Sequence, residues 1–333
     1  MSDDVSPHRF LDDILGFQKT AALKSAIALD LFSAIGRSGA TAADAAMRAG
    51  AAERGVRILC DFLTLNGHLE KEGARYALTP SSAAFLDRAS PMYMGSVVDF
   101  LASPEHIGRY LNDPVSFVRY GGSVGAQCTA PEDPSWITFA TAMVPFMQPV
   151  VQAVARTLSE LRLRPRRILD IAAGHGLFGI TLAQASANAT VVALDWPKVL
   201  ELARQNAVKA GIGDRYETIA GDAFEVDWGR GYDLVLIPNF LHHFDAETNR
   251  ALLARARAAL APGGRVVVVE MVPNEDRVSP PFPAAFAYMM LGATPRGDAY
   301  TLSQWEAIGR EAGLSKLEAF PLPPSPQTML VYS

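Results

Sequence analysis

The chain has 333 residues, of which 49% are hydrophobic and 20% are charged, and its formal net charge is −5. This length exceeds that of one ordinary core and predicts two domains, while the slightly acidic balance gives no general attraction to nucleic acid or anionic lipid. Its two cysteines, Cys60 and Cys128, exclude a disulfide framework, and the lack of an 18-residue apolar stretch predicts a cytoplasmic protein with no membrane partner.

The N-terminal region has the pattern of helices followed by a hairpin. Apolar residues at helical spacing predict one long helix over 8–36, ended by Gly36. Thr41 has the features of a helix cap, and a further helix is expected over about 52–65. A turn at 72–73 then separates two short strands. This order of elements is typical of a winged helix.

A winged helix raises the question of DNA binding, which the charges answer. Residues 1–100 contain 10 basic and 12 acidic residues, and the expected recognition helix mixes both signs. DNA-binding domains need a basic face, so the region is predicted to be a dimerisation module and not a nucleic-acid reader. The apolar first helix is the expected contact in a homodimer.

The segment 101–160 is expected to be helical and is rich in methionine and aromatic residues. Most of these side chains are expected to form core, because large apolar residues at helical spacing usually do so. Others are expected to line a pocket for a flat apolar molecule, since methionine adapts to irregular shapes and aromatic rings stack. The expected pocket residues, two of them from the later segment 282–291, are Phe139, Met143, Met147, Phe286 and Met290.

From about residue 161 onward, strands and helices alternate as in a doubly wound α/β sheet. A buried strand at 168–171 runs into the glycines Gly174 and Gly176, and a helix follows over about 177–186. Glycine lets the backbone approach a ligand closely, and the positive end of the helix dipole favours negative or acceptor groups there.

Two ligand classes fit this strand, glycine turn and helix. The glycine spacing matches dinucleotide-binding proteins, and Asp195 lies 21 residues after Gly174 at the end of the next expected strand, which alone favours NAD. Asp170, expected at the mouth of the first strand, would repel a pyrophosphate and attract an ammonium group. A nucleoside joined to an amino acid satisfies both acids, and S-adenosylmethionine is such a ligand.

A third acid follows the third expected strand, 216–220. Asp222 suits the amine of an adenine ring, with a neighbouring apolar residue packed on the ring. Acids after three successive strands form a stronger signal than any one of them, because ligands of such sheets collect at the carboxyl ends of the strands.

The fourth strand, expected over 232–237, leads into a pair of histidines, His242 and His243. A histidine near a strand end is usually structural, but a pair at the ligand-bearing edge is a candidate for proton transfer. Glu270 ends the next strand and could hold one of them, or it could be a capping acid. Because neighbouring residues leaving a strand point to opposite sides, only one histidine is expected to face the reaction unless the backbone turns sharply. The sequence contains no metal-ligand spacing.

Residues 8–333 resemble the two-domain O-methyltransferases of the plant caffeic-acid type and their bacterial secondary-metabolite relatives. The resemblance implies a class I methyltransferase domain with a Rossmann-like sheet at 161–333, a winged-helix dimerisation domain at 1–100 and a helical, pocket-forming segment between them. It also implies methyl transfer from S-adenosylmethionine to oxygen of an aromatic or polycyclic small molecule.

The motifs assign roles residue by residue. The segment 170–176 falls on the family's glycine motif, 194–197 on its ribose-binding strand end and 221–224 on its adenine motif. His242 falls on the catalytic base, and Glu270 on an acid that orients the base. The expected cofactor-binding residues are Asp170, Gly174, Gly176, Asp195, Trp196, Asp222, Ala223, Phe224 and Asn239.

Several positions depart from the family pattern. Ala172 and Ala173 replace glycines, and His243 stands where many members have aspartate. A second orienting acid is missing at Ala299 unless Asp298 replaces it. These departures keep open a cofactor-binding enzyme that hydroxylates, decarboxylates or catalyses pericyclic reactions. The winged helix adds a second alternative, a regulator that senses a small molecule, which the acidic first domain disfavours.

Overall fold

The computed structural model describes residues 6–124 and 135–333, and the chain divides into two compact units, Met1–Ile107 and Gly108–Ser333. Cys60 is buried in the first unit, and Cys128 lies outside the described residues. The finer division of the chain at 100 and 160 stays a prediction.

Three helices replace the single long helix predicted at the N-terminus: α1 His8–Ile14, α2 Gly16–Ala28 and α3 Leu31–Ile35. The helical path is interrupted at Asp30, whose φ of 50° lies in the left-handed region that a helix cannot contain. The prediction of one continuous helix is therefore wrong. The predicted stop at Gly36 is confirmed, because this residue caps α3 with a φ of 65°.

The rest of the first unit follows the predicted order. Two helices, α4 Ala42–Ala49 and α5 Glu53–Leu65, precede the hairpin β2 Leu69–Glu72 and β3 Arg75–Leu78, and β1 Ala40–Thr41 completes an antiparallel sheet of order β1-β3-β2. The Thr41 side chain accepts a hydrogen bond from the backbone of Asp44 at the start of α4, as its cap-like sequence predicts. The unit continues with α6 Pro80–Phe85 and α7 Val97–Leu101.

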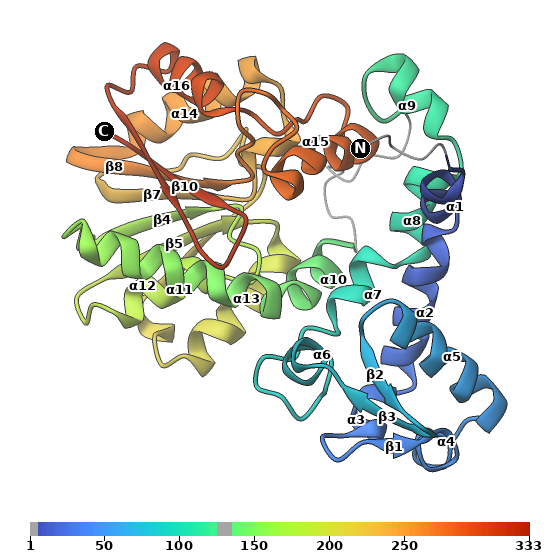
Figure 1. Ribbon diagram of the computed structural model, residues 1–333. Helices are drawn as coiled ribbons and strands as arrows, with labels where there is room; N and C mark the ends of the chain where they lie inside the picture. The colour runs from blue at the N-terminus through green and yellow to red at the C-terminus, as the bar shows by residue number, and fades with distance from the viewer. Residues whose placement is uncertain (1–5, 125–134) are drawn as a thin grey trace. The chain divides into compact units, whose positions relative to one another are not determined.

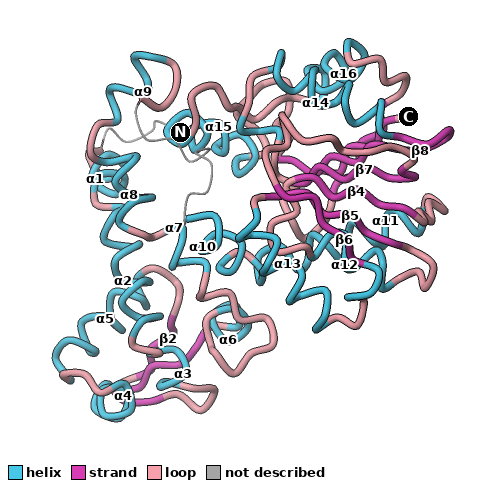
Figure 2. The backbone as a smooth tube through the Cα atoms, turned by 180° about the vertical axis from the view of Figure 1, so that it is seen from behind, coloured by secondary structure: helices cyan, strands magenta, loops and turns pink. Residues whose placement is uncertain are grey.

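The second unit is built on a seven-stranded sheet of order β6-β5-β4-β7-β8-β10-β9, shown in magenta in Figure 2. Its parallel strands are β4 Arg167–Ile171, β5 Thr190–Asp195, β6 Tyr216–Ala220, β7 Tyr232–Pro238 and β8 Leu260–Glu270. The strands β9 Leu317–Pro321 and β10 Thr328–Tyr332 add an antiparallel edge. Parallel strands covered on both faces require nearly continuous apolar sequence, and Ile168, Leu169 and Ile171 of β4 are fully buried.

Helices connect the strands. Those in or bordering the second unit are α8 Pro104–Leu111, α9 Pro114–Tyr120, α10 Ser135–Ala142, α11 Val144–Glu160, α12 Leu177–Gln184, α13 Pro197–Lys209, α14 Ala246–Ala259, α15 Pro281–Ala293 and α16 Leu302–Glu311. In Figure 1, α12 and α13 group together, apart from α14 and α16. Among the described residues no single helix has the length and apolar character to cross a membrane, and only the bent pair α10 and α11 together meets that test.

The strand order places the site. The chain runs outward from β4 through β5 to β6 and then returns to β7 on the other side of β4. Because crossovers between parallel strands are right-handed, the connections on the two sides of β4 pass over opposite faces of the sheet. A crevice forms at such a switch point, outside the carboxyl ends of the strands, and this is where ligands of open α/β sheets bind.

Candidate functional site

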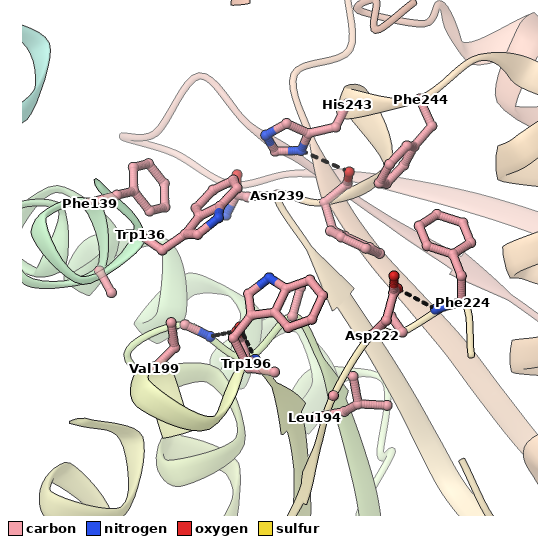
Figure 3. A pocket seen from close by; sticks show the side chains of 17 residues that line it. Trp136, Phe139, Leu194, Trp196, Val199, Asp222, Phe224, Asn239, His243 and Phe244 are labelled. Atoms are coloured by element: carbon pink, nitrogen blue, oxygen red, sulfur yellow. Dashed lines mark hydrogen bonds between the residues drawn. The ribbon is translucent and has the colours of Figure 1, made fainter. Parts of the chain in front are cut away.

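A cleft lies at this switch point, lined by the turns that follow β4, β5, β6 and β7 and by α10 (Figure 3). Segments up to about a hundred residues apart in the sequence therefore meet at one edge of the sheet. The predicted cofactor residues that line the cleft are Gly174, Asp195, Trp196, Asp222, Ala223, Phe224 and Asn239.

Asp170 lies beneath the glycine turn. The residue is fully buried, and its Oδ2 accepts a hydrogen bond from the backbone of Gly179 at 3.0 Å. Burial raises the pKa of this carboxyl to about 8, with the Asp195 charge adding to the shift and the Gly179 N–H opposing it. Asp170 is the next-to-last residue of β4, so it lies near the strand end as expected, but its side chain is enclosed. Its contact with a cofactor stays a prediction.

Gly176, the other predicted cofactor residue outside the cleft lining, lies against Tyr216. It has a φ of 76°, and an added Cβ would stand 2.5 Å from the Tyr216 hydroxyl. A Cβ on Gly179 would likewise stand 2.7 Å from Val191. Glycine at Gly176 lets the turn, and glycine at Gly179 lets the first turn of α12, pack this closely on the sheet beside the cleft.

Asp195 is held as an acceptor at the end of β5. Its Oδ2 accepts from the backbone N–H of Gly174 at 2.8 Å, and its Oδ1 accepts from that of Trp196 at 2.7 Å. Burial raises its pKa to about 6, and the two backbone hydrogen bonds oppose that rise. Two fixed oxygens with further lone pairs, beside an open cleft, match a ligand that carries neighbouring hydroxyl groups.

Aromatic side chains surround Asp222 at the next turn. Figure 3 shows Trp196, Asp222 and Phe224 pointing into the same cleft. The Phe224 ring is 43% exposed and rests edge-on against Phe244, with the ring centroids 5.1 Å apart. The backbone N–H of Phe224 donates to the Asp222 carboxylate at 2.8 Å. An exposed ring beside an acceptor suits a flat heterocycle that carries an amino group.

Two residues far away in the sequence support the lining. Arg255 of α14 donates to the carbonyl oxygens of Ala223 and Phe224, and so fixes the turn after β6. Gln327 donates to the side chain of Asn239, whose φ of 53° is left-handed and whose Nδ2 lies 3.5 Å from the Met147 sulfur. No local sequence signal marks Arg255 or Gln327, because their partners are 29 and more residues away.

His242 and Glu270 form the buried pair that the sequence predicts. His242 Nδ1 lies 2.6 Å from Glu270 Oε2, and Glu270 Oε1 accepts from the backbone N–H groups of Phe240, Leu241 and His242 at 3.0–3.3 Å. Both oxygens of the Glu270 carboxylate act as acceptors, Oε1 for the three backbone N–H groups and Oε2 for the His242 ring. The proton between the two side chains therefore belongs to His242 Nδ1. The other ring nitrogen, Nε2, then carries a lone pair.

His243 has a different partner. Its Nδ1 lies 3.0 Å from the carbonyl oxygen of Phe240, and the ring lines the cleft, whereas His242 is not among the lining residues. Burial and the neighbouring His242 lower the pKa of His243 to about 3. A 3₁₀ turn, Leu241–His243, brings the two rings to 4.2 Å between centroids, so they do not point to opposite sides of a strand.

The loop before α16 fixes this turn. The backbone N–H of Asp298 donates to the carbonyl oxygen of His242 at 3.0 Å. The Asp298 carboxylate accepts from Arg277 and from the N–H of Ala299, so its bonds are directed away from the histidine pair. Ala299 itself is 1% exposed. These contacts do not support Asp298 as a replacement for the missing second acid, and that role stays an untested alternative.

The predicted pocket residues fall into three groups. Phe139 lines the cleft. Met143, Met147 and Met290 are 5–7% exposed and belong to the core around it. The Phe286 ring stands perpendicular to that of His242, with centroids 4.9 Å apart. Contact of any of them with a substrate stays a prediction. Among the described residues, no group of three or more His, Cys, Asp or Glu side chains is arranged to hold a metal ion.

Comparison with known proteins identifies the family. The O-methyltransferase domain model matches residues 110–315, and the O-methyltransferase dimerisation domain model matches residues 11–88. The chain belongs to the O-methyltransferase family. It is an S-adenosylmethionine-dependent methyltransferase with the class I fold and an N-terminal helical dimerisation domain, as the resemblance predicts.

Individual relatives agree with this assignment. A 3-hydroxy-5-methyl-1-naphthoate 3-O-methyltransferase of Streptomyces sahachiroi is 30% identical over 93% of this chain and 90% of its own. A solved structure from Nostoc punctiforme, provisionally named an O-methyltransferase, is 43% identical with a TM-score of 0.95 over 99% of both chains. Human N-acetylserotonin methyltransferase, solved with S-adenosylmethionine, shares the fold at 20% identity, with a TM-score of 0.82 over 100% of this chain and 99% of its own.

Proposed function

We propose that this methyltransferase O-methylates an aromatic hydroxyl group and that His242 is the general base. The hydrogen bond between His242 and Glu270 carries the proposal, because it fixes the protonated nitrogen and leaves Nε2 as an acceptor. The three backbone donors to Glu270 fix the carboxylate in turn. The pair is thus arranged for proton transfer at one defined atom.

The same proposal assigns the cleft to S-adenosylmethionine. The acceptor oxygens of Asp195 suit the ribose hydroxyls, and Asp222 with the exposed Phe224 ring suits adenine. The glycine turn runs so close to the sheet that a Cβ at Gly176 would not fit, which supports a backbone-lined cradle. When bound, this cofactor supplies an electrophilic methyl group on a positively charged sulfur.

The residues of this chain then perform two tasks. His242 Nε2 accepts the hydroxyl proton as the oxygen becomes nucleophilic, and Glu270 stabilises the positive imidazolium that results. General base catalysis contributes about 10²–10⁴-fold. Holding the two reactants in line contributes more, up to roughly 7–11 kcal/mol of the barrier.

An aromatic acceptor is supported by the site and by its relatives. Trp136 and Phe139 line the cleft, and Phe286 stands edge-on to His242. The Streptomyces sahachiroi relative is named for a hydroxynaphthoate, and a Streptomyces glaucescens relative, 26% identical over 93% of this chain, for tetracenomycin polyketide synthesis. We therefore place this enzyme in secondary metabolism, acting on a phenolic or polycyclic compound.

The proposal includes a homodimer and a cytoplasmic location. The dimerisation-domain match supports the homodimer. The exposed apolar residues of α1 and α2 support it as well, because neighbouring exposed apolar side chains that form a patch usually belong to a protein–protein interface. They are Phe10, Leu11, Ile14 and Phe17.

The test is methyl transfer by the purified protein from S-adenosylmethionine with an isotopically labelled methyl group to a panel of phenols, followed by mass spectrometry. One labelled methyl ether per product is expected. His242→Gln should lower kcat about 100-fold or more without weakening S-adenosylhomocysteine binding, because the lost contact exists only in the transition state. Unchanged kcat in this variant would exclude His242 as the base, and hydroxylated or decarboxylated products would overturn O-methylation.

A further inference from the structure

The residues that line the cleft carry charge of one sign only. Asp195 and Asp222 are the acids among them, and no lysine or arginine of the described chain lines the cleft. We propose that the acceptor substrate is an uncharged arene and that the enzyme discriminates against arenes that carry a carboxylate. This inference rests on the proposed function and deepens it, because it adds the charge of the substrate to its aromatic class.

Two arginines contact residues at or next to the lining, and each already has acceptors. Arg255 donates to the carbonyl oxygens of Ala223 and Phe224 at 2.7 and 2.6 Å. Arg296 forms an ion pair with Asp245 at 3.0 Å, and its side chain is 77% exposed. Neither arginine is among the lining residues. A ligand in the cleft therefore meets no guanidinium group from either of them.

The chain segment before α10 adds no cation. The sequence of 125–134, which lies outside the described residues, contains Glu132 and Asp133 and no lysine, arginine or histidine. This segment therefore has no positive side chain to offer a ligand.

His243 is the histidine of the lining, and it is uncharged. Burial lowers its pKa to about 3, the neighbouring His242 lowers it further, and the hydrogen bond to the Phe240 carbonyl opposes the shift. Near neutral pH the ring is therefore neutral. It offers polarity to a ligand but no positive charge.

The aromatic side of the cleft gives a carboxylate no compensation for lost water. The Trp136 ring stands perpendicular to the Phe139 ring, with centroids 6.4 Å apart, and edge-on to His243 at 6.1 Å. Figure 3 shows Trp136 and Phe139 together on one side of the cleft, apart from Asp222. The faces of such rings carry partial negative charge. A carboxylate buried there would lose its hydration without gaining an ion pair, which costs free energy, whereas an uncharged ring system gains from burial.

The experiment measures how charge alone changes binding. It compares 3-hydroxy-1-naphthoate and 6-hydroxy-2-naphthoate, each with its own methyl ester, which keeps the ring and the hydroxyl but has no charge. Calorimetry is performed at pH 7 on the complex of the enzyme with S-adenosylhomocysteine, because the uncharged sulfur of this compound cannot replace the missing cation. We expect Kd to be about tenfold or more higher for each carboxylate than for its ester, and kcat/KM with S-adenosylmethionine to rank the four compounds in the same way.

Variants at Phe139 test whether the missing cation is the cause. Phe139→Arg places a guanidinium group in the lining and should lower the ratio of the carboxylate Kd to the ester Kd by about fivefold or more. Phe139→Gln removes the same ring without adding charge and should leave this ratio near the wild-type value. Val208→Arg adds the same charge at an exposed position outside the lining and should also leave the ratio unchanged. Thermal unfolding checks that each variant is folded.

Distinct results overturn the inference and the proposed function. If either carboxylate binds wild-type enzyme as tightly as its ester, the inference is wrong, although O-methylation stands, and this comparison needs no variant. If Phe139→Arg and Phe139→Gln change the ratio alike, the lack of a cation does not set the preference, and the inference is again wrong. If folded wild-type enzyme binds S-adenosylhomocysteine but methylates oxygen in neither the esters nor a broad range of phenols, the proposed function itself fails.

Discussion

Three carboxylates near the carboxyl edge of the sheet have different surroundings, and these differences separate their roles. Asp170 is enclosed and receives one backbone N–H, so burial raises its pKa to about 8. Asp195 receives two and has a pKa of about 6. Glu270 receives three backbone N–H groups and the ring of His242. The first supports the turn, the second faces the cleft and the third orients a histidine.

The raised pKa of Asp195 makes cofactor binding depend on pH. Without ligand the pKa of this carboxyl is about 6 instead of the ordinary 3.8, so a fraction of the molecules carries the proton near pH 6. Ribose hydroxyls that donate to the carboxylate favour the charged form and lower its pKa on binding. S-adenosylhomocysteine affinity should therefore fall as pH drops from 7 to 5, with proton release on binding near pH 6. Calorimetry in buffers of different ionisation enthalpy measures both quantities.

The matched variant is Asp195→Asn. Both oxygens of Asp195 accept from backbone N–H groups, and asparagine has only one oxygen. The NH2 group of asparagine would therefore face one of these N–H groups, and two donors repel each other. We expect binding weaker by about 1.5–3 kcal/mol, the range of a hydrogen bond to a charged group, and no proton release near pH 6. Full affinity in a folded variant would remove Asp195 from the ribose site.

At the scale of elements, the 3₁₀ turn Leu241–His243 decides which atoms face the cleft. Glu270 at the end of β8 accepts hydrogen bonds from the backbone N–H groups at this turn. On the other side, Asp298 in the loop before α16 donates its backbone N–H to the carbonyl oxygen of His242. The turn is thus held from two directions by segments that lie 28 and more residues away. Its geometry depends on the close approach of Gly297.

Gly297→Ala tests that dependence. The added Cβ would stand 2.3 Å from the His242 carbonyl oxygen, so either the loop or the turn must shift. We expect kcat at least tenfold lower, because a displacement of about 1 Å in a catalytic group can cost 10²-fold. Gly55→Ala is the control, since a Cβ there meets no atom within 4 Å and alanine favours the α5 helix. Steady-state kinetics and thermal unfolding check both variants, and equal kcat values would show that the turn tolerates the shift.

At the scale of the whole molecule, the chain combines a class I methyltransferase unit with an N-terminal dimerisation domain. The first unit buries its own core, which includes Leu31, Phe32 and Ile35, yet leaves Phe10 65% and Phe17 57% exposed. Such rings in water cost free energy that association recovers, so the exposed face of α1 and α2 is the expected contact between two copies.

Light scattering at low micromolar concentration should give twice the chain mass of 35.8 kDa. Phe17→Asp introduces a charge into the apolar contact and should shift the mass toward that of one chain. Val208→Asp, at a position 68% exposed on α13, is the matched control and should leave the mass unchanged. A wild-type monomer, or two variants that behave alike, would contradict a dimer built on α1 and α2.

The sequence alone determined the alternation of strands and helices, the glycine turn and the acids at the strand ends. These follow from local periodicity and short-range chemistry: β6 spans Tyr216–Ala220 as predicted, and Gly36 ends a helix. It also identified the family, because the motifs are contiguous. The break at Asp30 was not predictable, since a left-handed residue other than glycine leaves no strong local signal.

Only the tertiary structure decided which side chains face the cleft. Asp170 and Asp195 both lie near strand ends in the sequence, yet only Asp195 borders the cleft. Asp195 is the last residue of β5, whereas Asp170 lies inside β4 and is covered by the start of α12, where Gly179 donates to it. The histidine pair adopts one tautomer because Glu270 and the Phe240 carbonyl accept from it, and Gly297 fixes its turn. These partners are set by packing between distant segments, and local sequence carries no record of that packing.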